Sequence, residues 1–177
     1  MSQSSIGAEL RLFPPLPGRT LEWRAINDGV MGGVSRGGAE IAREGWLVFS
    51  GEVSLEHGGG FASVRTAPAP LGVTGVQALR LEARGDGKRY KLNLKTDAAF
   101  DGVQYQTAFT TPAGEWTSVA LPLDAFAPKF RGRDVPDAPA IDPARIVTVG
   151  FLISDRQEGP FRLEVRAISF VTKDGVP

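Results

Sequence analysis

The stretch RYKLNLKTDAAFDGVQYQTAF, residues 89–109, decides the predicted fold of this chain. In its first part Leu92 and Leu94 alternate with polar residues, and in its last part apolar residues alternate with Gln104 and Gln106. Strict alternation is typical of β-strands that bury one face. An Asp-Gly pair between the two runs is a turn signal. The stretch therefore predicts two antiparallel strands with one apolar and one polar face.

The rest of the chain repeats this pattern with little helix. Its 22 glycines and 13 prolines are spread along the whole length, which suits many short strands joined by turns. Only two short helical turns are expected, at 122–126 and 142–145. About nine or ten strands with almost no helix predict an all-β fold, a β-sandwich of jelly-roll type. Further strands are predicted at 46–55, 61–66, 77–84, 116–121, 146–153 and 161–170.

The length of 177 residues fits one domain with one hydrophobic core. We find no internal repeat, low-complexity tract or linker that would divide the chain. We therefore expect a flexible N-terminus over 1–8, a single sandwich domain over 9–172 and a C-terminal tail over 173–177.

The charge balance and the residue inventory exclude several classes of function. The formal net charge is zero, so the chain has no excess of cations for nucleic acid or for an anionic membrane surface. It has no cysteine, which excludes disulfides, thiolate catalysis and iron–sulfur clusters. No stretch approaches the ~20 apolar residues of a transmembrane segment, and the N-terminus lacks the pattern of a secretory signal. A cytoplasmic location is the expectation.

The common kinds of catalytic site also lack their residues. His57 is the only histidine, so a Ser-His-Asp triad would have to use it. It begins an HGGG run at 57–60, but the G-x-S-x-G elbow that accompanies such a run in hydrolases is missing. Transition-metal sites usually need several histidines or thiolates. We predict no enzyme activity, no cofactor and no metal site.

Carboxylates leave two alternatives open. Two of them suffice for a glycosidase, and loop carboxylates can bind Ca²⁺. The segment NDGVMGG at 27–33 lacks the D-x-D-x-D-G spacing that would favour calcium. Turn-forming aspartates and solvated glutamates are the plainer interpretation. The candidates are Asp28, Glu52, Glu56, Asp101, Asp124 and Asp155.

The segment WRAINDGVMGGVSRG, residues 23–37, is unusually rich in glycine. A phosphate-binding loop would lead into a helix, whereas this segment leads into another strand-like run. The glycines are better explained by positive φ angles or close backbone approach. We predict that the segment packs against GGGFASVR at 58–65, and that Asn27 and Asp28 hold it by hydrogen bonds to backbone groups or to Arg65. Trp23, Asn27, Asp28 and Met31 would then lie close together.

Two sets of polar residues are candidates for binding. If the strands pair as expected, their polar faces gather long side chains that can bond sugars, carboxylates or a partner's backbone; a plain solvated face is the alternative. A basic and aromatic run, KFRGR at 129–133, could clamp an acidic group, or could be a loop anchored by Phe130. The first set is Arg65, Lys91, Asn93, Gln104 and Gln106, and the second is Arg131 and Arg133.

Several segments together resemble the complex I intermediate-associated protein 30 family. Their order and rough spacing match along nearly the whole chain, from about Leu21 to Phe170. The segments are NDGVMGGVS at 27–35, GGGFASVR at 58–65, YKLNLKTDAAFDGVQYQTAF at 90–109, and the stretch from FRGR at 130–133 to SDRQEGPFRLEV at 154–165.

The resemblance implies a galactose-binding-like β-sandwich that is not a catalyst. Eukaryotic members are mitochondrial assembly factors that bind intermediates of respiratory complex I in a chaperone-like manner, so protein partners are expected. This chain lacks the long N-terminal extension of those members and resembles the bare domain of bacterial ones. The matching signature residues, expected to be structural, are Asn27, Asp28, Gly29, Met31, Gly32, Gly33, Ser35, Gly60, Phe61, Ser63 and Arg65.

A carbohydrate- or small-ligand-binding module is the alternative function. Sandwich domains often bind sugars, and the polar face around Arg65 would suit them. Sugar sites usually stack rings on exposed aromatic side chains. The chain has only three tryptophans and two tyrosines, and we expect Trp23, Trp46 and Trp116 to pack in the core.

Overall fold

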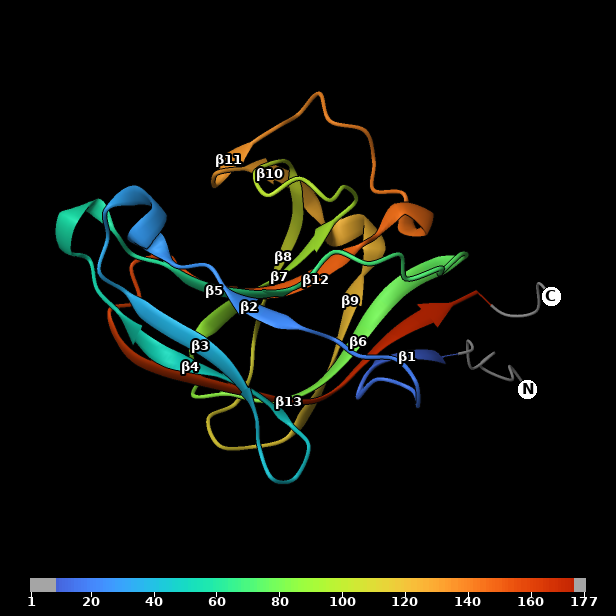
Figure 1. Ribbon diagram of the computed structural model, residues 1–177, viewed down its shortest axis with the longest axis horizontal. Helices are drawn as coiled ribbons and strands as arrows, with labels where there is room; N and C mark the ends of the chain where they lie inside the picture. Colours follow the sequence, from blue (N-terminus) through green and yellow to red (C-terminus); the bar gives the residue numbers. More distant parts are fainter. Residues whose placement is uncertain (1–8, 174–177) are drawn as a thin grey trace.

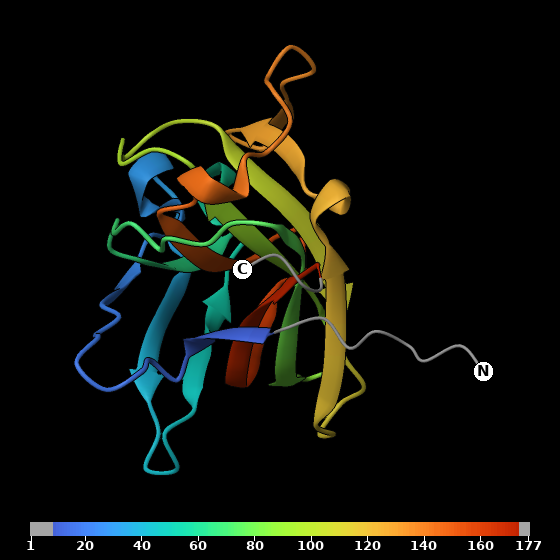
Figure 2. The same cartoon turned by 90° about the vertical axis from the view of Figure 1, so that its right-hand side faces the viewer.

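The computed structural model describes residues 9–173, which form two antiparallel β-sheets packed face to face (Figures 1 and 2). Within these residues the only helical segments are four short 3₁₀ turns. The predicted all-β sandwich is confirmed. The flexible terminus expected at 1–8 and most of the expected tail, 174–177, lie outside the described residues.

The first sheet contains, in order, β3 (Arg36–Ile41), β4 (Leu47–Val53), β13 (Gly159–Thr172), β6 (Val76–Arg84) and β9 (Thr117–Pro122), with β1 (Glu9–Phe13) also paired to β13. The second sheet contains, in order, β11 (Arg133–Asp134), β10 (Ala127–Phe130), β8 (Gln104–Thr110), β7 (Arg89–Lys95), β12 (Thr148–Ile153), β5 (Ala62–Thr66) and β2 (Trp23–Ala25). The 3₁₀ turns are η1 (Asp28–Met31), η2 (Glu56–Gly58), η3 (Leu123–Ala125) and η4 (Pro143–Arg145).

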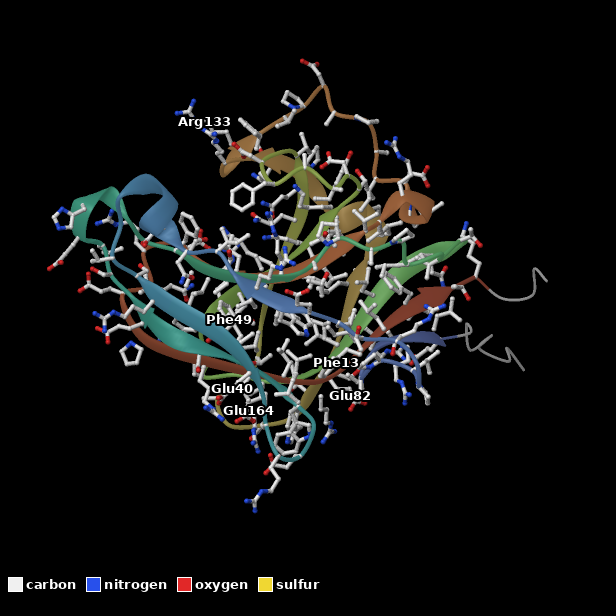
Figure 3. All side chains as sticks on the ribbon, viewed as in Figure 1. Phe13, Glu40, Phe49, Glu82, Arg133 and Glu164 are labelled. Atoms are coloured by element: carbon white, nitrogen blue, oxygen red, sulfur yellow. The ribbon has the colours of Figure 1, made fainter. Side chains whose placement is uncertain are left out.

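The core lies between the sheets and is built from the alternating apolar residues. In the hairpin that decides the fold, Tyr90 pairs with Phe109 and Leu94 with Tyr105, and all four side chains are buried. Figure 3 shows Phe49 of the first sheet pointing into the same space. Burying such side chains contributes roughly 1.5–3 kcal/mol each. Alternation therefore produces the fold by giving each sheet one apolar face.

The structure has more strands than the sequence pattern predicted. The additional ones are the short strands β1, β2, β10 and β11 and the glycine-rich β3, whose sequence RGGAEI lacks alternation. The strand predicted at 161–170 begins earlier, because Gly159 and Pro160 already belong to β13. The chain turns before it at Asp155 and Arg156, both with positive φ.

Two of the three tryptophans are not in the core. Trp23 is, since it stacks on Phe151 with ring centroids 6.2 Å apart. Trp46 and Trp116 instead meet edge to face at 4.7 Å and are half-buried, with Arg84 lying over both rings. The expectation that all three pack in the core was wrong. Trp46 directly precedes Leu47, the first inward-facing residue of β4, so its side chain lies on the other face of the sheet.

Candidate functional site

Asp28 joins the glycine-rich segment to the segment that leads into β5. Its side chain is fully buried. Oδ1 accepts a hydrogen bond from Ser35 N at 2.9 Å, and Oδ2 accepts from Gly60 N at 2.7 Å and Phe61 N at 3.3 Å. The backbone N–H of Asp28 donates to the Phe61 carbonyl, and its carbonyl accepts from Gly33 N. One side chain thus fixes the relative position of two loops.

Asn27 and Ser35 extend this arrangement to the strands on either side. Asn27 Nδ2 donates to the Gly37 carbonyl at 3.0 Å, and its Oδ1 accepts from Ser63 N at 3.2 Å. Ser35 Oγ donates to the Ser54 carbonyl at 3.1 Å and accepts from Ser54 N at 2.9 Å. The glycine-rich segment is therefore bound to β3 at the edge of the first sheet and to β5 of the second.

These bonds decide what the glycine-rich segment does. Asn27 and Asp28 hold it through backbone groups, as predicted, whereas Arg65, the alternative partner, donates to the Phe100 carbonyl in another loop. Gly32 has a φ of 86°, in the left-handed region that favours glycine. Both carboxylate oxygens of Asp28 are already occupied by backbone N–H groups. The segment is a structural connection in which the Asp28 carboxylate is used within the chain.

The ionisation of Asp28 contributes to stability in a pH-dependent way. Burial opposes ionisation, but the hydrogen bonds from Ser35, Gly60 and Phe61 outweigh it and hold the pKa of Asp28 below its ordinary value. A lowered folded-state pKa contributes stability that is complete above the unfolded pKa of about 3.9 and is lost as the pH falls through the folded value.

We therefore expect acid to weaken the wild-type chain more than an Asp28→Asn variant. In urea titrations between about pH 6 and pH 2.5, the difference in free energy of unfolding between the two proteins should be constant above about pH 5 and should narrow below it. A difference that stays constant down to the lowest pH would show that folding does not lower the pKa of Asp28.

A row of six residues, four of them polar, crosses the outer face of the second sheet and is here called the polar row. Its members are register partners on adjacent strands, and strands about 4.8 Å apart give it a length of about 24 Å. Asn93 and Gln106 are bonded to each other, with Nε2 of Gln106 donating to Oδ1 of Asn93 at 2.8 Å. From β2 to β10 the row is Arg24, Arg65, Gly150, Asn93, Gln106 and Ala127.

The predicted polar face exists, but its arrangement differs from the sequence expectation in two ways. Arg65 and Asn93 are not on neighbouring strands, because β12 runs between them and places Gly150 there. The face is also not plainly solvated, since Asn93 is only 8% exposed. Lys91 lies on this face and donates to Ser154 Oγ and Asp155 Oδ1, both at 2.9 Å. Gln104 lies there too, opposite Lys129.

A cleft of about 270 Å³ lies at the β2 end of the polar row, between β5 and the segment 96–102. Lys95, at the end of β7, is only 2% exposed, and its Nζ donates to the Ala99 carbonyl. The Arg65 guanidinium lies 4.9 Å from the centre of the Phe100 ring, which is 64% exposed. The lining residues include Arg24, Ile26, Arg65, Lys95, Phe100 and Thr148.

The basic run at 129–133 is not part of this cleft. Arg131 pairs with Asp101 and lies over the Phe130 ring, so its charge is matched within the chain. Arg133 is exposed on the edge strand β11, and Figure 3 shows it pointing away from the sandwich. The predicted binding residues therefore do not form one site. Met31 ends η1, and its side chain lies outside the described part of the structure.

The catalytic alternatives gain no support. Three of the six candidate carboxylates have partners of their own: Asp28 with backbone N–H groups, Asp101 with Arg131, and Asp155 with Lys91. His57 is exposed on η2. Within residues 9–173, no three His, Asp or Glu side chains are placed to share a metal ion, and no helix has the length and hydropathy to cross a membrane.

Four lining residues of the cleft were not among the predicted binding residues: Arg24, Lys95, Phe100 and Thr148. The alternation in 89–95 does place Lys95 on the same face as Asn93, so this signal was available. The fold-back of segment 96–102 over Lys95 had no signal in the pattern.

Comparison with known proteins gives one family. The model of the family described as complex I intermediate-associated protein 30 matches residues 16–165. The mitochondrial protein of that name from Drosophila melanogaster is 26% identical over 166 residues, covering 81% of this chain and 56% of its own length. The one from Mus musculus is 33% identical over 100 residues, covering 53% and 30%. The chain thus spans about half the length of the fly protein, and the match covers a smaller share of the length of the mouse protein.

Solved structures share the fold. A family 11 carbohydrate-binding module of a Clostridium thermocellum cellulase superposes with a TM-score of 0.65 at 15% identity, over 96% of this chain and 97% of the module. A family 29 carbohydrate-binding module gives a TM-score of 0.57 at 12% identity, over 96% and 98%. At such identities the likeness establishes the β-sandwich fold and nothing about ligands.

Proposed function

Because the chain belongs to the complex I intermediate-associated protein 30 family, we propose that it is a non-catalytic interaction domain that binds assembly intermediates of a respiratory complex in a chaperone-like manner. The family match over residues 16–165 carries this proposal. Both relatives named above bear the family's name. The chain would act in the cytoplasm and reach the inner membrane only through its protein partner.

The polar row is the surface that suits such a partner. Its amide and guanidinium groups can bond a partner's backbone and carboxylates. Gly150 at its centre leaves the main chain of β12 uncovered by a side chain of its own. The outer face of the first sheet is less suited, because its charges are matched within the chain: Glu164 pairs with Arg84 and Arg162.

We expect the tagged chain to capture respiratory-complex subunits or assembly factors from a detergent-solubilised lysate of its own host, with mass spectrometry as the readout. Gln106→Ala should reduce the capture, because it removes an amide from the polar row and leaves the Asp28 bonds intact. The matched control is Glu40→Ala, an exposed residue that Figure 3 shows on the outer side of the other sheet.

Two results would contradict the proposal. One is a set of captured proteins no different from that of an unrelated sandwich domain. The other is capture of respiratory subunits with equal loss in Gln106→Ala and Glu40→Ala, which would contradict the assigned surface and leave the partner class in place.

A second candidate is a carbohydrate-binding module, favoured by the fold likeness and by the polar row. One matching module structure holds a β-1,3-1,4-mixed-linked tetrasaccharide. Such sites usually offer aromatic rings for stacking, and here Trp46 and Trp116 lie on the opposite sheet. We expect no rise in melting temperature with mixed-linked or other oligosaccharides, with or without Ca²⁺. A saturable rise would move this candidate to first place.

A further inference from the structure

The cleft at the β2 end of the polar row concentrates positive charge. Arg24 and Arg65 are direct register partners on β2 and β5, and Lys95 lines the same cleft. Like charges placed directly opposite each other on paired strands destabilise a sheet. An anion between them would remove this cost.

Two of these cations are incompletely neutralised by the chain itself. In the described residues Arg65 forms no ion pair: its guanidinium bonds the Phe100 carbonyl, and Asp101, whose charge acts on it from a greater distance, is paired with Arg131. Lys95 reaches its nearest carboxylate, that of Asp97, only at 3.7 Å. Burial, and then the nearby Arg65, hold the pKa of Lys95 below its usual value. Arg24 differs, because it pairs with Glu22 at 3.1 Å in an exposed position.

The Thr148 hydroxyl is an independent indication that the cleft binds a ligand. Its side chain is 2% exposed and lines the cleft as the register partner of Lys95. Its Oγ1 is buried and has no hydrogen-bond partner in the described structure. A buried hydroxyl without a partner costs about 1–3 kcal/mol, so such groups usually have a ligand, ion or water nearby.

We propose that this cleft binds the oxyanion group, a carboxylate or a phosphate, of a small ligand. Lys95 and Arg65 would supply the positive charge, and Thr148 Oγ1 would donate a hydrogen bond to the bound oxygen. Charge-assisted bonds of this kind are the strong ones in proteins. A volume of about 270 Å³ admits a ligand of small-metabolite size, and the exposed Phe100 ring offers a flat surface for an apolar body.

A second depression is also lined by arginines, but it differs from the cleft in its charge balance. It measures about 320 Å³ and is lined by Arg84, Asp86, Arg162 and Glu164, among others. Here the charges are matched: Glu164 pairs with both arginines, and Asp86 accepts bonds from Tyr90 Oη and from a backbone N–H of Arg162. Nothing in that depression calls for an added anion.

The test is isothermal titration calorimetry of the purified chain at pH 7 in a low-chloride buffer, with inorganic phosphate, acetate and benzoate as separate probes. We expect saturable binding of phosphate or of acetate with Kd near 1 mM. The probe that binds, phosphate or acetate, identifies the ligand group as a phosphate or a carboxylate. If acetate binds, benzoate should bind more tightly, and Phe100→Ala should remove that advantage while leaving acetate binding in place.

Three variants locate the site. Arg65→Gln should weaken binding at least about tenfold by removing a positive charge, and Thr148→Val about fivefold by removing a hydroxyl donor. Thr148→Val should fold at least as stably as the wild type because it removes an unpaired hydroxyl, so loss of binding cannot be assigned to unfolding. Arg43→Gln, an exposed arginine before β4, is the control and should bind as the wild type does.

No saturable heat with any probe up to 50 mM, or equal affinities in Thr148→Val, Arg65→Gln and Arg43→Gln, would overturn the assignment. The site goes beyond the proposed function. Because the titration contains only the purified chain, a failure of partner capture and a failure of anion binding remain distinguishable.

Discussion

Asp28→Ala should lower the free energy of unfolding by about 4 kcal/mol. The carboxylate is fully buried and accepts bonds from Ser35 N, Gly60 N and Phe61 N. Without it these backbone N–H groups lose their acceptor in a buried place, and each unpaired group costs about 1–3 kcal/mol. Two loops and the strands of both sheets that they join would lose their connection together.

The measurement is thermal and urea unfolding followed by circular dichroism. For a chain of this size the melting temperature should fall by roughly 8–16 °C. Asp124→Ala is the matched control, since Asp124 is exposed in the first turn of η3 and its removal should change stability by no more than about 0.5 kcal/mol. Equal losses in the two variants would mean that Asp28 does not hold the loops.

The sequence could predict the sandwich because the fold depends on a pattern that each segment carries by itself. Strands with strict alternation, such as 89–95 and 161–170, were found, and the short helical turns η3 and η4 were expected within a residue or two. The strands β2, β10 and β11, at the two ends of the second sheet, are only two to four residues long. These strands form because a neighbouring strand offers free backbone N–H and C=O groups. Pairing with a segment far away in the sequence leaves no pattern in the local sequence.

The candidate site was predictable to a smaller extent. Alternation places Arg65, Asn93 and Gln106 on polar faces, but it cannot show that β12 inserts Gly150 between the first two. The role of Asp28 was foreseen because Asn and Asp side chains in a glycine-rich segment readily bond to backbone groups. The cleft was not foreseen, because it depends on how the segment 96–102 folds back over Lys95.

Gly33→Ala should be nearly as damaging as Asp28→Ala, with a loss of about 3 kcal/mol. A Cβ on Gly33 would lie 2.4 Å from Cγ of Asp28, and one on Gly59 would lie 2.4 Å from Oδ2 of the same side chain. The carboxylate is fixed by its hydrogen bonds, so it cannot move away without losing them. Positions 33 and 59 therefore both require glycine, because the backbone at each approaches the Asp28 side chain closely.

Gly29→Ala is the matched control in the same turn. A Cβ there would meet nothing within 4 Å, and Gly29 has no positive φ, so the stability should stay within about 1 kcal/mol of the wild type. The decisive comparison is a double-mutant cycle. If the collision with the carboxylate is the cause, Gly33→Ala should cost much less in the Asp28→Ala background, where Cγ and both oxygens are gone. An undiminished cost in that background would show that the carboxylate is not the cause, and would assign the effect to Cβ of residue 28, which lies 2.8 Å from the same position, or to the backbone of Gly33.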